Sequence, residues 1–132
     1  MSFADAIKSG FSNYANFHGR ARRSEYWFFT LFVVVLMIVF EALLSIAKAS
    51  GSPALMLIVS LPALIFDLGI LLPILAINVR RLHDIDRSGW WYFLLLVPIV
   101  GYIVWLIWFC TPGTIGPNRF GEDPKSVAYA AA

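Results

Sequence analysis

Three long apolar runs, separated by short polar segments, dominate the pattern of hydrophobic positions along the chain. They cover residues 27–47, 54–79 and 90–110, and together they contain two acidic residues and no basic one. About 20 consecutive apolar residues are enough to cross the hydrocarbon core of a bilayer as a helix. The pattern therefore predicts an all-α integral membrane protein with three transmembrane helices, the first two joined by a tight turn.

The third run, 90–110, carries Pro98 and Gly101 near its middle, so two interpretations stay open. It is either a kinked helix that crosses the membrane or a re-entrant hairpin. Reversing the chain inside the hydrocarbon exposes backbone polar groups that need protein or water partners, which favours a crossing. The hairpin would instead place nine of the ten Lys and Arg residues on one side, as the positive-inside rule prefers. We expect three crossings.

Residues 1–24 form an Arg-rich segment with one apolar face. Phe3, Ile7, Phe11 and Tyr14 recur at spacings of three and four, which predicts an amphipathic helix. Such a helix either lies in the headgroup region of the membrane or packs against the protein's own loops.

Composition supports the membrane class and excludes others. The 132 residues, enough for one domain, are 60% hydrophobic and 14% charged, and their mean hydropathy is +0.77. A soluble domain of this size would lack the polar surface to cover so much apolar material. The net charge of +2 gives no reason to expect nucleic acid, and the single Cys110 excludes an intrachain disulfide and a cysteine-based metal site.

The segment 80–89, between the second and third runs, is the densest charged stretch in the interior of the sequence. With three crossings, it shares a side with residues 1–24, and the two segments hold seven of the ten Lys and Arg residues. The positive-inside rule therefore predicts a cytosolic N-terminus.

Three signature segments resemble a known family. They are Phe17–Trp27, Arg80–Asp84 with its continuation Ser88–Trp90, and Gly116–Pro124 within the turn-rich C-terminal segment 111–132. They resemble domain-of-unknown-function family 805, the YhaH-like small bacterial inner-membrane proteins. The resemblance implies a multi-pass protein of the bacterial cytoplasmic membrane and brings no activity with it. The candidate C-terminal motif consists of Asn118, Arg119, Phe120, Gly121, Asp123 and Pro124.

Six arginines flank the apolar runs on the predicted cytosolic side and are candidates for binding anionic lipid headgroups or a membrane partner. They are Arg20, Arg22, Arg23, Arg80, Arg81 and Arg87. An ion-pair network offers another role for some of them. We expect Arg20 or Arg23 to pair with Asp84, and Glu25 to pair with Arg80 or Arg81.

His83, Asp84 and Asp86 place one imidazole and two carboxylates within four residues, to which Glu25 and His18 could be added. A divalent metal site and a lipid-acting enzyme are conceivable there. Metal sites normally draw ligands from several segments, and short matches are weak signals. We therefore assign Glu25, His83, Asp84 and Asp86 to a structural network and expect neither a metal nor a cofactor.

Glu41 and Asp67 are the ionisable residues inside the apolar runs, and such residues are candidates for function. Counted at 1.5 Å per residue, Glu41 lies about 21 Å from the cytosolic end of the first predicted helix, and Asp67 lies about 18 Å from the cytosolic end of the second. If they face each other, an oligomeric transporter or channel subunit becomes the second hypothesis. The leading hypothesis is a non-enzymatic membrane module with membrane lipids as partners, and a homo-oligomer or membrane-protein partner as a further possibility.

Overall fold

The computed structural model describes residues 1–125, and the end of the predicted segment 111–132 lies outside that range. Regular structure in the described part is helical, apart from one isolated bridge between Asn118 and Gly121. The elements are α1 (Phe3–Ser12), α2 (Arg23–Ser50), α3 (Pro53–Asp84), the 3-10 helix η1 (Gly89–Leu96) and α4 (Val100–Cys110). The predicted all-α class is confirmed.

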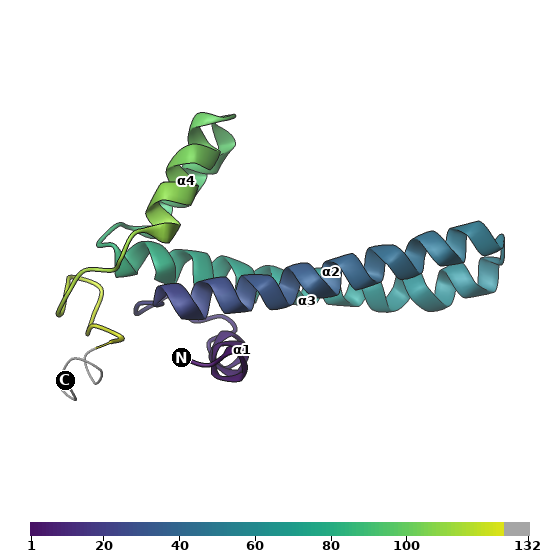
Figure 1. Ribbon diagram of the computed structural model, residues 1–132, viewed down its shortest axis with the longest axis horizontal. Coiled ribbons are helices and arrows are strands. Elements are labelled where there is room, and N and C mark those ends of the chain that lie inside the picture. The colour runs from purple at the N-terminus through teal and green to yellow at the C-terminus, as the bar shows by residue number, and fades with distance from the viewer. Residues whose placement is uncertain (126–132) are drawn as a thin grey trace.

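The helices α2 and α3 form a long antiparallel hairpin (Figure 1). Gly51 ends α2 with a φ of 68°, a left-handed conformation that glycine adopts without steric cost, and Ser52 Oγ accepts the Leu55 N–H at 3.3 Å to begin α3. The helices contain 28 and 32 residues, or about 42 Å and about 48 Å at the helical rise. Both have the length and composition to cross a membrane.

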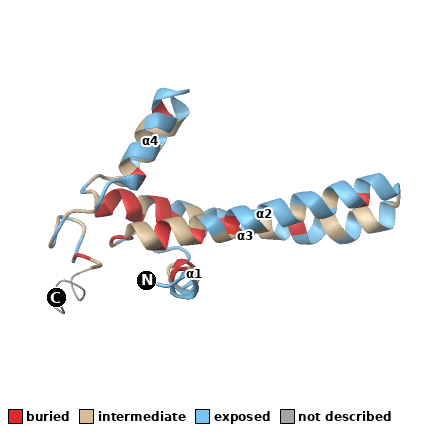
Figure 2. Ribbon diagram, viewed as in Figure 1, coloured by how far each residue is buried: buried red, intermediate tan, exposed pale blue. Residues whose placement is uncertain are grey.

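Burial is concentrated at the end of the hairpin away from the Gly51 turn, where α2 begins and α3 ends (Figure 2). There Tyr26, Phe29, Ile77, Leu82 and Phe109 form the core. Toward the turn the apolar side chains are mostly exposed, as expected where lipid is the solvent. The sequence predicted a loop over residues 80–89. In the structure the first half of that stretch is helical, because α3 continues to Asp84 and is buried there.

The third apolar run contains the hairpin and not the continuous crossing that the sequence favoured. The chain reverses between η1 and α4, where Ile99 adopts a φ of 65°. A Cβ on Gly101 would lie 2.2 Å from Leu94 O, so the two backbones are in close contact, and the Trp91 and Trp108 rings meet edge to face at 5.6 Å. The 11 residues of α4 reach about 16 Å, roughly half the hydrocarbon thickness. α4 stands off the long hairpin at a steep angle (Figure 1).

The helix α1 is seen end-on in Figure 1, so it runs across α2. A Cβ on Gly10 would meet the Phe29 ring at 2.2 Å, and Phe11 stacks edge to face with Phe29 and Phe32. The aromatic face of α1 therefore packs against α2, a helix, whereas the two alternatives drawn from the sequence were the headgroup region and the protein's own loops. Its exposed residues still include Phe3 and Phe11.

Candidate functional site

Asp84, the last residue of α3, lies at the centre of a buried cluster that we call the junction, formed by Arg20, Arg81 and Asp84. Asp84 Oδ1 accepts hydrogen bonds from Nε of Arg20 at 3.0 Å and lies 3.0 Å from its Nη2, while Oδ2 pairs with Arg81 Nη1. All three side chains are at most 2% exposed. Buried charges are tolerated only when they are paired and hydrogen-bonded, so the fold depends on keeping the junction intact.

The junction also fixes the segment that follows α4. Thr114 N donates to Asp84 O at 2.7 Å. Other guanidinium nitrogens of Arg20 and Arg81 donate to backbone carbonyls, those of Phe109, Thr111, Thr114 and Gly116. Two of these carbonyls belong to the C-terminal end of α4, where a cation is favoured by the helix dipole. The start of the C-terminal segment therefore lies beside the end of α3.

Gly113 makes this approach possible. A Cβ at this position would lie 2.1 Å from Asp84 Oδ2, which no side chain tolerates. Sequence reasoning did not single out Gly113, because only the folded position of Asp84 reveals why the residue is glycine.

A second buried ion pair joins three helices. Glu25 Oε1 lies 2.8 Å from Arg80 Nη1 and accepts a hydrogen bond from Ser9 Oγ at 2.7 Å, so α1, α2 and α3 meet there. The structure thus contains an Arg20–Asp84 pair and a Glu25–Arg80 pair, as the sequence predicted.

His83 connects the three signature segments. Its Nδ1 is 2.9 Å from Gly19 O, and because a carbonyl can only accept, Nδ1 is the donor. The ring stacks on Phe120 with centroids 4.0 Å apart, and Asn118 Nδ2 donates to His83 O at 2.9 Å. His83 therefore has a clear structural role.

The rest of the C-terminal motif is held by local contacts. Gly121 exchanges backbone hydrogen bonds with Asn118, and Pro124 is half-buried. Arg119 pairs with Asp86 at 3.3 Å on an exposed surface. Burial raises the pKa of Asp123, but hydrogen bonds from the Lys125 and Gly116 amides outweigh it, so the pKa lies below its ordinary value.

The six candidate arginines divide into two groups of three. Arg20, Arg80 and Arg81 are buried in ion pairs and are not available to lipid headgroups, so of the two roles that the sequence suggested the structure shows ion pairing and not lipid binding for these three. The remaining three, which we call the free arginines, are partly exposed and form no ion pair within residues 1–125. They are Arg22, Arg23 and Arg87.

The free arginines Arg23 and Arg87 both reach the end of α4. Arg23 Nη1 donates to Cys110 O at 3.1 Å, and Trp27 Nε1 donates to Phe109 O at 3.2 Å beside it. The Arg87 guanidinium lies 4.2 Å from the Trp108 ring centroid, within the range of a cation–π interaction. Cationic and indole side chains thus surround one helix end.

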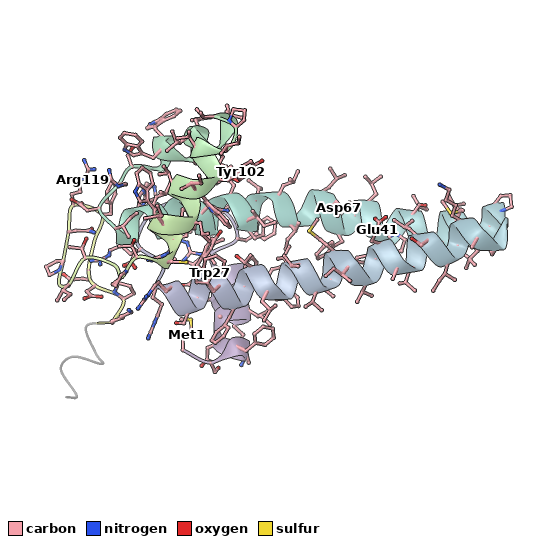
Figure 3. The ribbon with its side chains drawn as sticks, turned by 45° about the horizontal axis from the view of Figure 1, so that its top comes forward. Met1, Trp27, Glu41, Asp67, Tyr102 and Arg119 are labelled. Atoms are coloured by element: carbon pink, nitrogen blue, oxygen red, sulfur yellow. The ribbon has the colours of Figure 1, made fainter. Side chains whose placement is uncertain are left out.

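Glu41 and Asp67 lie in the half of the α2–α3 hairpin nearer the Gly51 turn, which we call the outer half (Figure 3). Both residues are exposed, and no side-chain hydrogen bond or ion pair joins either carboxylate to another group in the described part of the chain. The structure does not show them paired.

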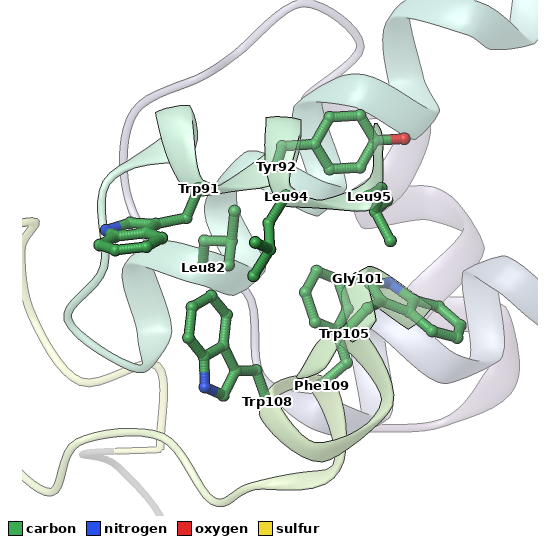
Figure 4. A pocket seen from close by; sticks show the side chains of 9 residues that line it. All are labelled: Leu82, Trp91, Tyr92, Leu94, Leu95, Gly101, Trp105, Trp108 and Phe109. Atoms are coloured by element: carbon green, nitrogen blue, oxygen red, sulfur yellow. The ribbon is translucent and has the colours of Figure 1, made fainter. Parts of the chain in front are cut away.

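No metal cluster is found among residues 1–125. No three His, Cys, Asp or Glu side chains gather there as a metal site would require. The cavity between η1 and α4 (Figure 4), lined by Trp91, Trp105 and Trp108 among others, has a volume of about 10 Å³. That is barely enough for one water molecule, so it is packed interior.

Comparison with known proteins identifies the family. The family model described as "Protein of unknown function (DUF805)" matches residues 14–122. This chain belongs to that family. Its relatives include "Inner membrane protein YhaI" of Escherichia coli (strain K12), 45% identical over 115 residues (86% of this chain and 89% of the relative). "Inner membrane protein YhaH" of the same strain is 40% identical over 116 residues (86% and 90%).

A more distant relative, "Uncharacterized protein YiiR" of Escherichia coli (strain K12), is 28% identical over 142 residues, covering 88% of this chain and 90% of the relative. No solved structure matches. As a DUF805 member with apolar helices of membrane-spanning length, the chain is a small inner-membrane protein of a family of unknown function. All three signature segments that carried the resemblance meet at the junction and His83.

Proposed function

We propose that the protein is a non-enzymatic membrane module that binds anionic phospholipid headgroups through the free arginines, with the N-terminus in the cytosol. The observation that carries the proposal is the division of the arginines. Three neutralise buried carboxylates, while Arg22, Arg23 and Arg87 have no ion-pair partner among residues 1–125. Arg23 lies beside Trp27 and Arg87 over the Trp108 ring. Indole rings favour the membrane interface, where a neighbouring guanidinium can reach phosphate.

The local structure around Arg23 supports headgroup binding. Arg23, Ser24, Trp27 and Cys110 line an open groove of about 300 Å³. It lies at the N-terminus of α2, which has no side-chain cap, and both the helix dipole and the guanidinium favour an anion there. Ser24 Oγ and Arg22 Nε are buried without a hydrogen-bond partner in the described chain.

The same geometry argues against a lipid-acting enzyme centred on His83 and Asp84. Both oxygens of the Asp84 carboxylate are occupied by guanidinium groups, and the side chain is 2% exposed. A general base must reach the proton it removes. This carboxylate has no free approach.

Lipid binding to the purified protein in mild detergent, measured by native mass spectrometry, tests the proposal. Wild type should prefer phosphatidylglycerol over phosphatidylcholine, and the triple variant R22Q/R23Q/R87Q should lose that preference. Each basic residue near anionic lipid contributes about 1 kcal/mol, or about fivefold in affinity. The matched control K8Q/K48Q/K125Q removes the same charge elsewhere and should keep the preference. An unchanged preference in the arginine variant would overturn the proposal.

A further inference from the structure

A second groove, separate from the free arginines, runs between α3 and η1. Its volume is about 450 Å³, within the range of small-molecule sites. Leu75, Val79 and Phe93 line its apolar part, and His18, His83 and Phe120 line its polar end. It thus combines an apolar channel with a polar end, the two environments that an amphiphile requires.

His83 is the built polar element of this groove. The residue is 8% exposed, its ring is held by the Phe120 stack, and Nδ1 is occupied by Gly19 O. In the neutral ring Nε2 then carries a lone pair, and it has no hydrogen-bond partner among residues 1–125. His83 lines the groove, so a ligand there that donates a hydrogen bond would satisfy this acceptor.

The surroundings define the rest of the ligand. Leu75 is 38% exposed and Phe93 is 58% exposed, so the apolar part opens onto the lipid-facing surface of the helices. At the polar end the Arg119 guanidinium lies 4.7 Å from the Phe120 ring centroid. It also pairs with Asp86 at 3.3 Å, but this pair is on the surface and the Arg119 side chain is 62% exposed, so a partly compensated cation lies close to the mouth. The groove therefore fits a ligand with an acyl chain, a hydrogen-bond donor and a negative charge, and an anionic lipid with a polar headgroup combines all three.

We infer that the groove binds an anionic phospholipid whose headgroup carries a hydroxyl. One acyl chain lies along Leu75 and Val79, the hydroxyl donates to His83 Nε2, and the phosphate faces Arg119. The inference rests on the proposed binding of anionic lipid and adds a second site with headgroup selectivity.

Two lipids with identical acyl chains test it, phosphatidylglycerol and phosphatidylethanol, since both are anionic phosphodiesters and only the first has headgroup hydroxyls. Wild type should bind phosphatidylglycerol about fivefold more tightly, the effect of one hydrogen bond. H83N keeps an N–H near the position of Nδ1 and removes the acceptor at Nε2, so the two lipids should bind equally. L75W should weaken both lipids, whereas L64W, a substitution at another exposed leucine of α3, should weaken neither.

Equal binding of the two lipids by wild type, or a discrimination that survives H83N, overturns the inference. If H83N does not fold, the leucine variants decide, and equal binding by L75W and L64W overturns it. Failure here with an intact preference for anionic over zwitterionic lipid would leave the proposed function standing. Loss of that preference in wild type would remove both.

Discussion

Arg20 and Asp84 are 64 positions apart, yet Arg20 Nε lies 3.0 Å from Asp84 Oδ1 in a site where both side chains are almost fully buried. Their contact joins the segment before α2 to the end of α3, and the other Arg20 donors extend it to the segment after α4. The contact therefore determines the architecture of this end of the protein.

Removing the charge of Asp84 should destabilise the protein severely. D84N leaves Arg20 and Arg81 buried without their counter-charge, and breaking a buried pair costs about 3–5 kcal/mol. D86N, which breaks the exposed pair with Arg119, should cost less than about 1 kcal/mol. Thermal unfolding in detergent, followed by tryptophan fluorescence, compares them. Equal melting temperatures for the two variants would contradict a structural role for the junction.

Adding one methyl group at Gly113 should displace the C-terminal segment. Its Cβ would lie 2.1 Å from Asp84 Oδ2, and overpacking costs about 1–3 kcal/mol. Gly69→Ala is the control, because a Cβ there meets nothing within 4 Å and alanine favours a helix. Limited proteolysis of the C-terminal segment should accelerate in G113A and not in G69A. Identical proteolysis would show that the segment does not pack on Asp84.

Charge reversal should reveal the pairing of Glu25 with Arg80. E25R and R80E each place like charges together in a buried site and should lower the yield of folded protein strongly. The double variant E25R/R80E restores opposite charges and should recover part of that loss, measured by size-exclusion chromatography in detergent. Additive losses would argue against a direct interaction.

The carboxylates in the outer half of the hairpin should be dispensable for lipid binding. E41Q and D67N remove exposed charges from the apolar part of the hairpin, far from the free arginines, so the preference for phosphatidylglycerol should stay within about twofold of wild type. A proton-coupled transporter would instead lose activity in these variants. Abolished lipid preference in E41Q/D67N would contradict the assignment of lipid binding to the free arginines.

Much of the architecture could be predicted from the sequence. The signals that predict it are either local or depend only on which end of the hairpin a residue occupies. Apolar length predicts α2 and α3. Placing Glu25, Arg80, Arg20 and Asp84 at one end of that hairpin was enough to propose their pairing. The glycine-rich segment after α4 likewise predicted turns.

The remainder depends on contacts that leave no side-chain pattern. The guanidinium groups of Arg20 and Arg81 also donate to backbone carbonyls, which every residue possesses, so no residue type indicated that the segment after α4 packs there. The reversal before α4 requires Ile99 at a φ of 65° and a ψ of −64°, and β-branched residues rarely adopt a positive φ. Pro98 and Gly101 indicated a break but not its direction.

The junction holds the N-terminal segment, the end of α3 and the start of the C-terminal segment together, so we expect both termini on one side of the membrane. Reporter fusions at each terminus test it most directly, using green fluorescent protein for the cytosol and alkaline phosphatase for the periplasm. We expect fluorescence from both termini and phosphatase activity from neither. A fluorescent N-terminal fusion together with an active C-terminal phosphatase fusion would contradict it and restore a third crossing.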